Sequence, residues 1–175
     1  MPGPRHLVLT GAPGAGKTTL LAAAERSGLA TSPEVARTLL RAPGGMALRA
    51  DDPLGFAAAM IAAHRAEYEA VRDRAGPVVF DRGFPDVAGF LDVLGLAIPP
   101  EIDRVCRTVR YNGPVLRAPA WQEIYRTDPE RIQTWDEAVE SDRAVTAAWK
   151  RYGYTVEDLP LVPVEERLRF LRARL

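Results

Sequence analysis

The fold is decided by the stretch Gly11-Ala12-Pro13-Gly14-Ala15-Gly16-Lys17-Thr18, which Thr19 follows directly. This stretch fits the pattern G-x-x-x-x-G-K-[ST], in which glycines let the backbone curl and point successive N–H groups inward at an anion. The apolar run before it, residues 5–10, predicts a short buried strand, and residues 18–26 after it predict a helix. A glycine-rich loop between a strand and a helix is typical of a phosphate-binding loop.

Residues 11–19 have the chemistry needed to bind a nucleoside triphosphate. The helix that follows the loop contributes unpaired amides and the positive end of its dipole. Lys17 is placed to reach the β- and γ-phosphates, and the Thr18 hydroxyl is placed to ligate Mg²⁺. The alternative is a simple turn in a glycine-rich protein, but the only other lysine of the chain is Lys150, which argues against a chance lysine here. We therefore expect ATP or GTP, with Mg²⁺, at this loop.

Strands and helices are expected to alternate along the chain. This alternation favours an α/β fold in which helices cover both faces of a parallel sheet. Because no repeat or linker interrupts it, we expect a single domain over residues 1–175. The further expected strands are residues 29–32, 78–80, 114–116 and 154–157, and the further expected helices are residues 34–41, 52–75, 85–94, 101–109, 134–152 and 164–175.

The composition is that of an ordinary globular protein, with 47% hydrophobic and 26% charged residues and a formal net charge of zero. No global basic field attracts nucleic acid, so we expect no nucleic-acid partner. Cys106 is the single cysteine, and no Cys/His cluster has zinc spacing. No apolar run suits a signal peptide or a membrane span. We expect a cytoplasmic protein without a membrane partner; the oligomeric state is not indicated.

Asp81 and Arg82 end the apolar run 78–80. Open α/β sheets bind ligands in the crevice beyond the carboxyl ends of their strands, which is where these two side chains would lie. Asp81 is a candidate to hold the Mg²⁺ shell or to accept a proton from an attacking hydroxyl, and Arg82 to clamp a phosphate or acceptor oxygen. The alternative is an ordinary strand-end turn with a helix-capping Asp.

Glu34 and Arg37 follow the second expected strand and should face the same crevice. Glu34 is a candidate general base and Arg37 a candidate clamp on acceptor or phosphate; a helix-start Glu beside a solvated Arg is the alternative. Helices 34–41 and 52–75 would wall the acceptor pocket. His64 and Tyr68, four residues apart on the second of these helices, are candidates to line the pocket, with plain packing as the alternative.

Residues 117–134 form a polar, arginine-containing segment that we expect to act as a lid. In phosphoryl transfer, charge spreads over the equatorial oxygens, and an arginine brought in by a mobile segment stabilises it. Arg126 and Arg131 are the best candidates for this role. A solvated surface is the alternative, because arginine is common throughout the chain.

Several motifs together resemble a family of small AAA-type ATP/GTP-binding P-loop proteins, and the broader group of nucleoside and nucleotide kinases. The resemblance implies a five-stranded parallel sheet of order 2-3-1-4-5 with a lid over the phosphates. It also implies that Glu34 acts as base, that the Asp81-Arg82 pair holds metal and substrate, and that Arg126 and Arg131 are lid arginines. The motifs are GAPGAGKTTL at 11–20, PEVAR at 33–37, VVFDRGFPDV at 78–87, APAWQEIYRTDPER at 118–131 and PVEERLRFL at 163–171.

The leading functional hypothesis is an ATP- or GTP-dependent phosphotransferase that moves the γ-phosphoryl group to a hydroxyl of a small molecule. A regulatory NTPase, in which hydrolysis changes a partner-binding surface, is the first alternative. The chain has no N/T-K-x-D segment after a late strand, which argues against a Ras-like switch. A polynucleotide 5′-kinase is a further alternative, but it would need a basic groove that the neutral charge balance does not indicate.

Overall fold

The computed structural model describes residues 5–127 and 133–175. Its centre is a parallel sheet with the strand order β2-β3-β1-β4-β5, so the predicted order is confirmed. In the register of this sheet, Leu9 lies beside Asp81 and Gly11 lies beside Ala118, which brings the ends of three strands to one edge. The strands are β1 (His6–Gly11), β2 (Ala30–Ser32), β3 (Val78–Asp81), β4 (Val115–Ala118) and β5 (Val156–Asp158).

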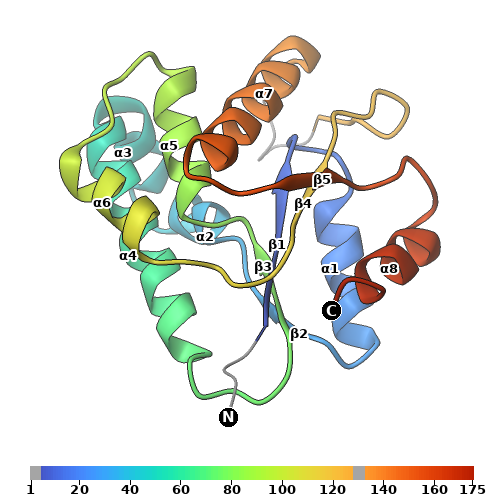
Figure 1. Cartoon of the computed structure of the whole chain (residues 1–175). Coiled ribbons are helices and arrows are strands. Elements are labelled where there is room, and N and C mark those ends of the chain that lie inside the picture. Colours follow the sequence, from blue (N-terminus) through green and yellow to red (C-terminus); the bar gives the residue numbers. More distant parts are fainter. Residues whose placement is uncertain (1–4, 128–132) are drawn as a thin grey trace.

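Helices cover both faces of the sheet, as the sequence predicts (Figure 1). On one face α1 packs against α8, and on the other α4 packs against α5, which packs against α7. The short helices α2 and α3 pack against α4 on this second face. The helices are α1 (Lys17–Arg26), α2 (Val35–Arg41), α3 (Gly45–Asp51), α4 (Pro53–Ala70), α5 (Phe84–Val93), α6 (Pro100–Thr108), α7 (Trp135–Arg151) and α8 (Val164–Arg172).

The strands supply a separate hydrophobic core to each face. Along β1, Leu7 and Leu9 pack into the core beneath α1 and α8, whereas Val8 packs into the core beneath α4, α5 and α7. Successive side chains of a strand point to opposite faces, so a strand covered on both sides reads as a continuous apolar run. This is why the short runs in β1 and β3 were recognisable as central strands.

Two helices depart from the sequence expectation. The sequence predicts that residues 43–45 end the helical structure after α2. In the structure, a further helix, α3, begins at Gly45, and Gly44 before it has a φ of 77°. Left-handed backbone suits glycine, so the turn that ends α2 also opens α3. The sequence offers Asp51 or Asp52 as the cap of α4, and the structure has Asp52 in this position, where its side chain accepts a hydrogen bond from Gly55 N. Helix α4 ends at Ala70 rather than at residue 75, because residues 72–75 are exposed and have no apolar face to pack.

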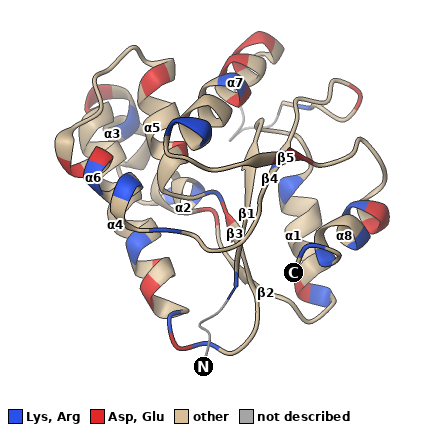
Figure 2. Cartoon of the chain, viewed as in Figure 1, with Lys and Arg blue, Asp and Glu red and all other residues tan. Residues whose placement is uncertain are grey.

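Charged side chains of both signs are distributed over the outer helices (Figure 2). This agrees with the zero formal net charge, and among the helices only the short α2, with Arg37 and Arg41, carries basic residues without an acidic one. Among the helices of the described residues, none has the length and apolar character required to cross a membrane.

Candidate active site

The loop between β1 and α1 has the curled backbone that the sequence predicts. Gly11, Gly14 and Gly16 have φ values of 112°, 71° and 82°, in the region that residues with a Cβ rarely adopt. A Cβ at Gly11 would lie 2.3 Å from Ala118 O. The first glycine therefore lets the loop leave the sheet against β4, and the others let it turn its amides into the curve.

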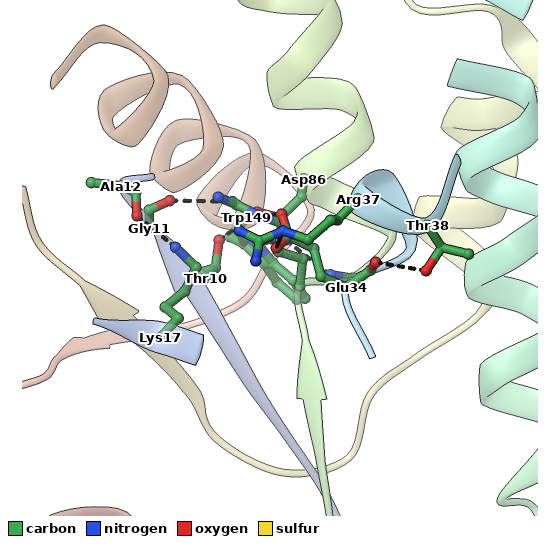
Figure 3. Close-up of polar contacts among 11 residues, drawn as sticks. Thr10, Gly11, Ala12, Lys17, Glu34, Arg37, Thr38, Asp86 and Trp149 are labelled. Carbon is green, nitrogen blue, oxygen red and sulfur yellow. Dashed lines mark hydrogen bonds and ion pairs between the residues drawn. The ribbon is translucent and has the colours of Figure 1, made fainter. Parts of the chain in front are cut away.

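Lys17 is folded back onto this loop. Its ammonium donates a 2.5 Å hydrogen bond to Ala12 O, and the residue is only 7% exposed (Figure 3). Burial and the positive charge of Arg82 lower the pKa of Lys17 to about 8, against the opposing pull of the carboxylates of Asp81 and Glu34. A polyphosphate in the loop would supply the negative charge that this buried ammonium lacks.

Asp86, on the first turn of α5, is the polar hub of the site. Its Oδ1 accepts hydrogen bonds from Thr10 Oγ1 at 2.6 Å and Arg82 Nη1 at 3.0 Å, and its Oδ2 accepts from Gly83 N and Trp149 Nε1, both at 3.0 Å. These partners come from β1, the end of β3 and α7 (Figure 3). In the sequence, Asp86 stands at the start of the expected helix 85–94, and nothing there indicates this role.

Arg82 joins the loop to the second strand. Its Nη1 donates to Gly11 O at 3.2 Å, and its Nε lies 3.8 Å from Glu34 Oε1. The residue has a φ of 67°, a conformation that no other non-glycine residue adopts in the described part of the chain. Burial lowers the pKa of Arg82, but the carboxylates of Asp86 and Glu34 raise it overall. The guanidinium thus stays charged and lines the main cavity beside the glycine loop.

Glu34 and Arg37 meet at the start of α2. The two side chains lie 3.6 Å apart (Figure 3). Both line the main cavity together with Arg82. The structure therefore places Glu34 in the crevice next to the glycine loop, which is the position that a role as general base would require. Arg37 has a carboxylate partner, so the alternative of a simply solvated arginine does not describe it.

Asp81 is buried at the end of β3. Its Oδ1 has no hydrogen-bond partner among the described residues. Burial and the neighbouring Glu34 raise the pKa of Asp81 to about 6, although Lys17 and Arg82 oppose the shift. Asp81 and Thr18 line the same small cavity of about 260 Å³. The described residues contain no group of three or more acidic, His or Cys side chains arranged around a metal position.

A cavity of about 930 Å³ opens between the glycine loop and the helices of the second face. Its walls include side chains of α2 and α4, the two helices predicted to wall a pocket. His64 lines it and is only 3% exposed, and burial lowers its pKa to about 4. Tyr68 does not line it. Instead Tyr68 packs against Phe80 and Tyr111 and donates a hydrogen bond to Arg110 O, so packing is the correct interpretation there.

The segment expected to act as a lid begins later than predicted. Arg117 belongs to β4, where its guanidinium binds Asp142 at 2.7 Å and Asp158 at 3.1 Å. The exposed Arg126 donates to Glu123 O and Tyr125 O and does not line the cavity. The predicted Arg131 lies outside the described residues. From this segment, the described residues that line the cavity are Trp121, Ile124 and Gln133.

Arg167 of α8 is a second residue at the site that no motif in the sequence indicates. It donates to Ala15 O of the loop at 2.7 Å and to Pro160 O at 2.8 Å, and its guanidinium lies 4.9 Å from the centre of the Trp121 ring. Burial lowers the pKa of Arg167. This arginine holds the glycine loop from the opposite side of the sheet, at a sequence distance of 152 residues.

A parallel sheet of order 2-3-1-4-5, with a glycine loop and a lysine after its central strand, defines a P-loop protein with the kinase-like topology. A family model described as an AAA domain matches residues 6–167. The chain therefore belongs to this family, in agreement with the resemblance seen in its motifs. No curated protein matches it.

Solved structures with the same fold are known. Deoxyadenosine kinase from M. mycoides with bound dATP has a TM-score of 0.71 at 14% identity, covering 96% of this chain and 97% of that one. NadR in complex with NAD and AMP-PNP has a TM-score of 0.71 at 16% identity, covering 98% of this chain and 49% of NadR. Thymidylate kinase from Candida albicans has a TM-score of 0.67 at 9% identity, covering 98% and 90%. At these identities the likeness defines the fold alone.

Proposed function

We propose that this protein is a P-loop phosphotransferase that moves the γ-phosphoryl group of ATP or GTP to a hydroxyl of a small molecule. The observation that carries the proposal is the convergence of Lys17, Glu34 and Arg82 on one cavity that also reaches the glycine loop. The same cavity thus contains the Lys17 ammonium for the phosphates, the Glu34 carboxylate to accept a proton, and the Arg82 guanidinium for the transferring group. Such an arrangement positions reactants and stabilises developing charge, which is most of what phosphoryl transfer requires.

The donor would bind with its phosphates in the curl of residues 11–19. Backbone amides and the start of α1 would hold the phosphate oxygens, and Lys17 would leave Ala12 O for the β- and γ-phosphates. Nucleotide binding as such is supported by two solved structures of this fold, of which one is described with bound dATP and another with AMP-PNP. The choice between ATP and GTP is left to the binding experiment.

Thr18 and Asp81 are the residues that would hold Mg²⁺. They fit the ion because they line one cavity and because Asp81 Oδ1 is a buried oxygen without a hydrogen-bond partner among the described residues. Oxygen ligands of this kind suit Mg²⁺, which keeps several waters and takes few protein ligands. When bound, the ion would neutralise charge on the β- and γ-phosphates.

Glu34 is the better placed general base. It lines both cavities and lies beside Arg82, whereas Asp81 is buried and is better suited to the metal. In the proposed step, the acceptor oxygen forms a bond to the γ-phosphorus while the bond from that phosphorus to the β–γ bridging oxygen breaks. The hydroxyl proton passes to Glu34, and the nucleoside diphosphate leaves with the bridging oxygen. Arg37, His64 and Arg82 would contact the acceptor. Arg126, and Arg131 outside the described residues, would stabilise the charge of the transferring group.

The test is nucleotide turnover with and without candidate hydroxyl acceptors. A phosphotransferase releases nucleoside diphosphate in an acceptor-dependent way, with slow hydrolysis in the absence of an acceptor. Lys17→Ala should reduce turnover at least about a thousandfold while leaving the circular dichroism spectrum unchanged. The control is Lys150→Ala, which removes the only other lysine, an exposed residue on α7.

Two results would count against the proposal. Full activity in Lys17→Ala would remove the catalytic assignment of the loop. Hydrolysis that no acceptor stimulates, but that a protein partner does, would indicate a regulatory NTPase in its place.

A further inference from the structure

We infer that the acceptor is an apolar alcohol: a hydroxyl group carried on a largely hydrocarbon or aromatic skeleton. The inference rests on the proposed function and names the chemical class of its substrate. It comes from the wall of the main cavity on the side away from the glycine loop.

This wall is built from apolar side chains of four helices. They come from α2, α3, α4 and α5, and several of them are long or aromatic. Apolar walls of this kind bind ligands chiefly by removing hydrocarbon surface from water. The wall residues are Val35, Leu40, Met46, Phe56, Met60, Phe90, Val93 and Leu94.

The mouth of the cavity gathers most of the exposed apolar side chains of the protein. Six large apolar residues are exposed in the described part of the chain, and four of them line this cavity. Met46 is 52% exposed, Leu94 47%, Ile124 37% and Val93 36%. Scattered apolar residues on a surface need no explanation, but their concentration around one opening marks a site for an apolar partner.

Several polar side chains that line the cavity are engaged within the protein. Asp86 accepts four hydrogen bonds, Glu34 lies between Arg37 and Arg82, and Glu137 accepts a 2.7 Å hydrogen bond from Thr134 N. Among the described residues of the lining, Gln133 has the only side-chain amide. A nucleobase brings several donors and acceptors that lose water on binding, and each needs a partner. Such a wall favours a skeleton with few polar atoms.

The cavity also fixes where the hydroxyl must be. Arg82 Nη1 donates a hydrogen bond to Gly11 O of the glycine loop, and Glu34 lies beside Arg82. Both residues also line the cavity that contains the apolar wall, so they lie next to the loop at the end of the cavity where phosphoryl transfer would occur. An alcohol would place its hydroxyl at this end of the cavity and its skeleton against α4 and α5. The transfer then proceeds as written above, with Glu34 taking the proton and the alcohol oxygen taking the phosphoryl group.

The experiment measures phosphorylation of the linear primary alcohols from 1-butanol to 1-octanol, with 3-phenyl-1-propanol, thymidine and deoxyadenosine as comparisons. Burying one methylene stabilises a complex by about 0.8 kcal/mol, so KM should fall about fourfold per added carbon. The aromatic alcohol should exceed both nucleosides in kcat/KM. A KM that does not depend on chain length, or a nucleoside with a kcat/KM above that of every alcohol, would overturn the inference while leaving the phosphotransferase intact.

Matched variants locate the effect at the cavity mouth. Leu94→Ser removes a 47% exposed leucine that lines the cavity, and Leu54→Ser removes a 44% exposed leucine that does not. The first should raise KM for 1-octanol about fivefold to tenfold and leave the KM for nucleotide unchanged. The second should change neither constant. Equal effects of the two variants would contradict the assignment.

A second readout separates this inference from the proposed function. Displacement of the fluorescent probe 8-anilinonaphthalene-1-sulfonate by 1-octanol reports occupation of the cavity without any turnover. Displacement that Leu94→Ser weakens and Leu54→Ser does not would support the apolar site even if no acceptor were phosphorylated. Absence of displacement, together with flat alcohol kinetics, would remove the inference.

Discussion

At the scale of single residues, Asp86 and Lys17 have different and complementary roles in the site. Asp86 satisfies its carboxylate entirely within the protein and orients Arg82 toward the loop. Lys17 is a buried ammonium with a backbone carbonyl as its hydrogen-bond acceptor. One side chain therefore keeps the site assembled, and the other is poised to exchange its partner for a phosphate.

Replacing Asp86 by asparagine should strongly destabilise the fold. The amide would turn one acceptor into a donor, which would face either Trp149 Nε1 and Gly83 N or Thr10 and Arg82. We expect a loss of about 3 kcal/mol in the free energy of unfolding, measured by urea denaturation. The control on the same helix is Asp92→Asn, whose partner Arg151 lies at the surface; it should cost at most about 1 kcal/mol. Similar losses in the two variants would contradict the account of Asp86 as the hub.

His64 should make the stability of the protein depend on pH. Burial lowers its pKa to about 4, against an ordinary value of 6.5, so between these values the unfolded chain binds more protons than the folded one. The free energy of unfolding therefore falls as the pH drops. From pH 7 to pH 5, the wild type should lose about 2 kcal/mol more than His64→Gln. Urea denaturation at both pH values tests this, and an equal loss in the two proteins would refute it.

The residues that the sequence identified are those whose signal is local. Lys17 and Thr18 belong to a continuous pattern, and Glu34, Asp81 and Arg82 lie at or just beyond the ends of strands. Trp149 and Arg167 reach the site from helices that are distant in sequence. Their contacts depend on the tertiary fold, so no residue spacing in the sequence could predict them. The role of Asp86 was missed for the same reason, although its place at a helix start was visible.

At the scale of elements, the tight packing of α5 on α7 positions Asp86, the polar hub of the site. A Cβ added at Gly89 would lie 2.7 Å from Val145 Cα, so the two helices approach closely only because position 89 is glycine. This contact holds Asp86 on α5 within reach of Trp149 on α7.

Gly89→Ala should therefore separate the two helices. In an exposed helix this change stabilises by up to about 1 kcal/mol. Here overpacking against backbone should outweigh that gain, and we expect a net loss of about 1 to 2 kcal/mol with weakened turnover. Thermal denaturation gives the sign directly. A raised melting temperature would show that the two helices are not in close contact at this position.

Element boundaries were predictable where apolar periodicity or capping marked them. A cap at Asp51 or Asp52 and the order of strands and helices followed from the sequence, and the structure has the cap at Asp52. Helix α3 was missed because glycine at positions 44 and 45 reads as a break, and β4 was placed short because Arg117 looked like a lid residue. Its pairing with Asp142 and Asp158 makes Arg117 part of the sheet.

At the scale of the whole molecule, two cores on either side of one sheet meet at the edge where the strands end. The glycine loop lies between them, held by β4 on one side and by Arg167 of α8 on the other. Both substrate sites of the proposed reaction open into the single large cavity beside this edge. The sequence predicted the sheet and the loop, but the chamber depends on how α2, α4, α5 and α7 pack, and that is set by the fold as a whole.

The central claim is that the curled backbone of residues 11–18 captures a polyphosphate, and calorimetric titration tests it most directly. Non-hydrolysable analogues of ATP and GTP, each with Mg²⁺, would be titrated into the wild type and Lys17→Ala. We predict binding of one nucleotide per chain to the wild type and a loss of at least about tenfold in affinity in the variant. No heat with either nucleotide, or equal affinity in the two proteins, would contradict the account.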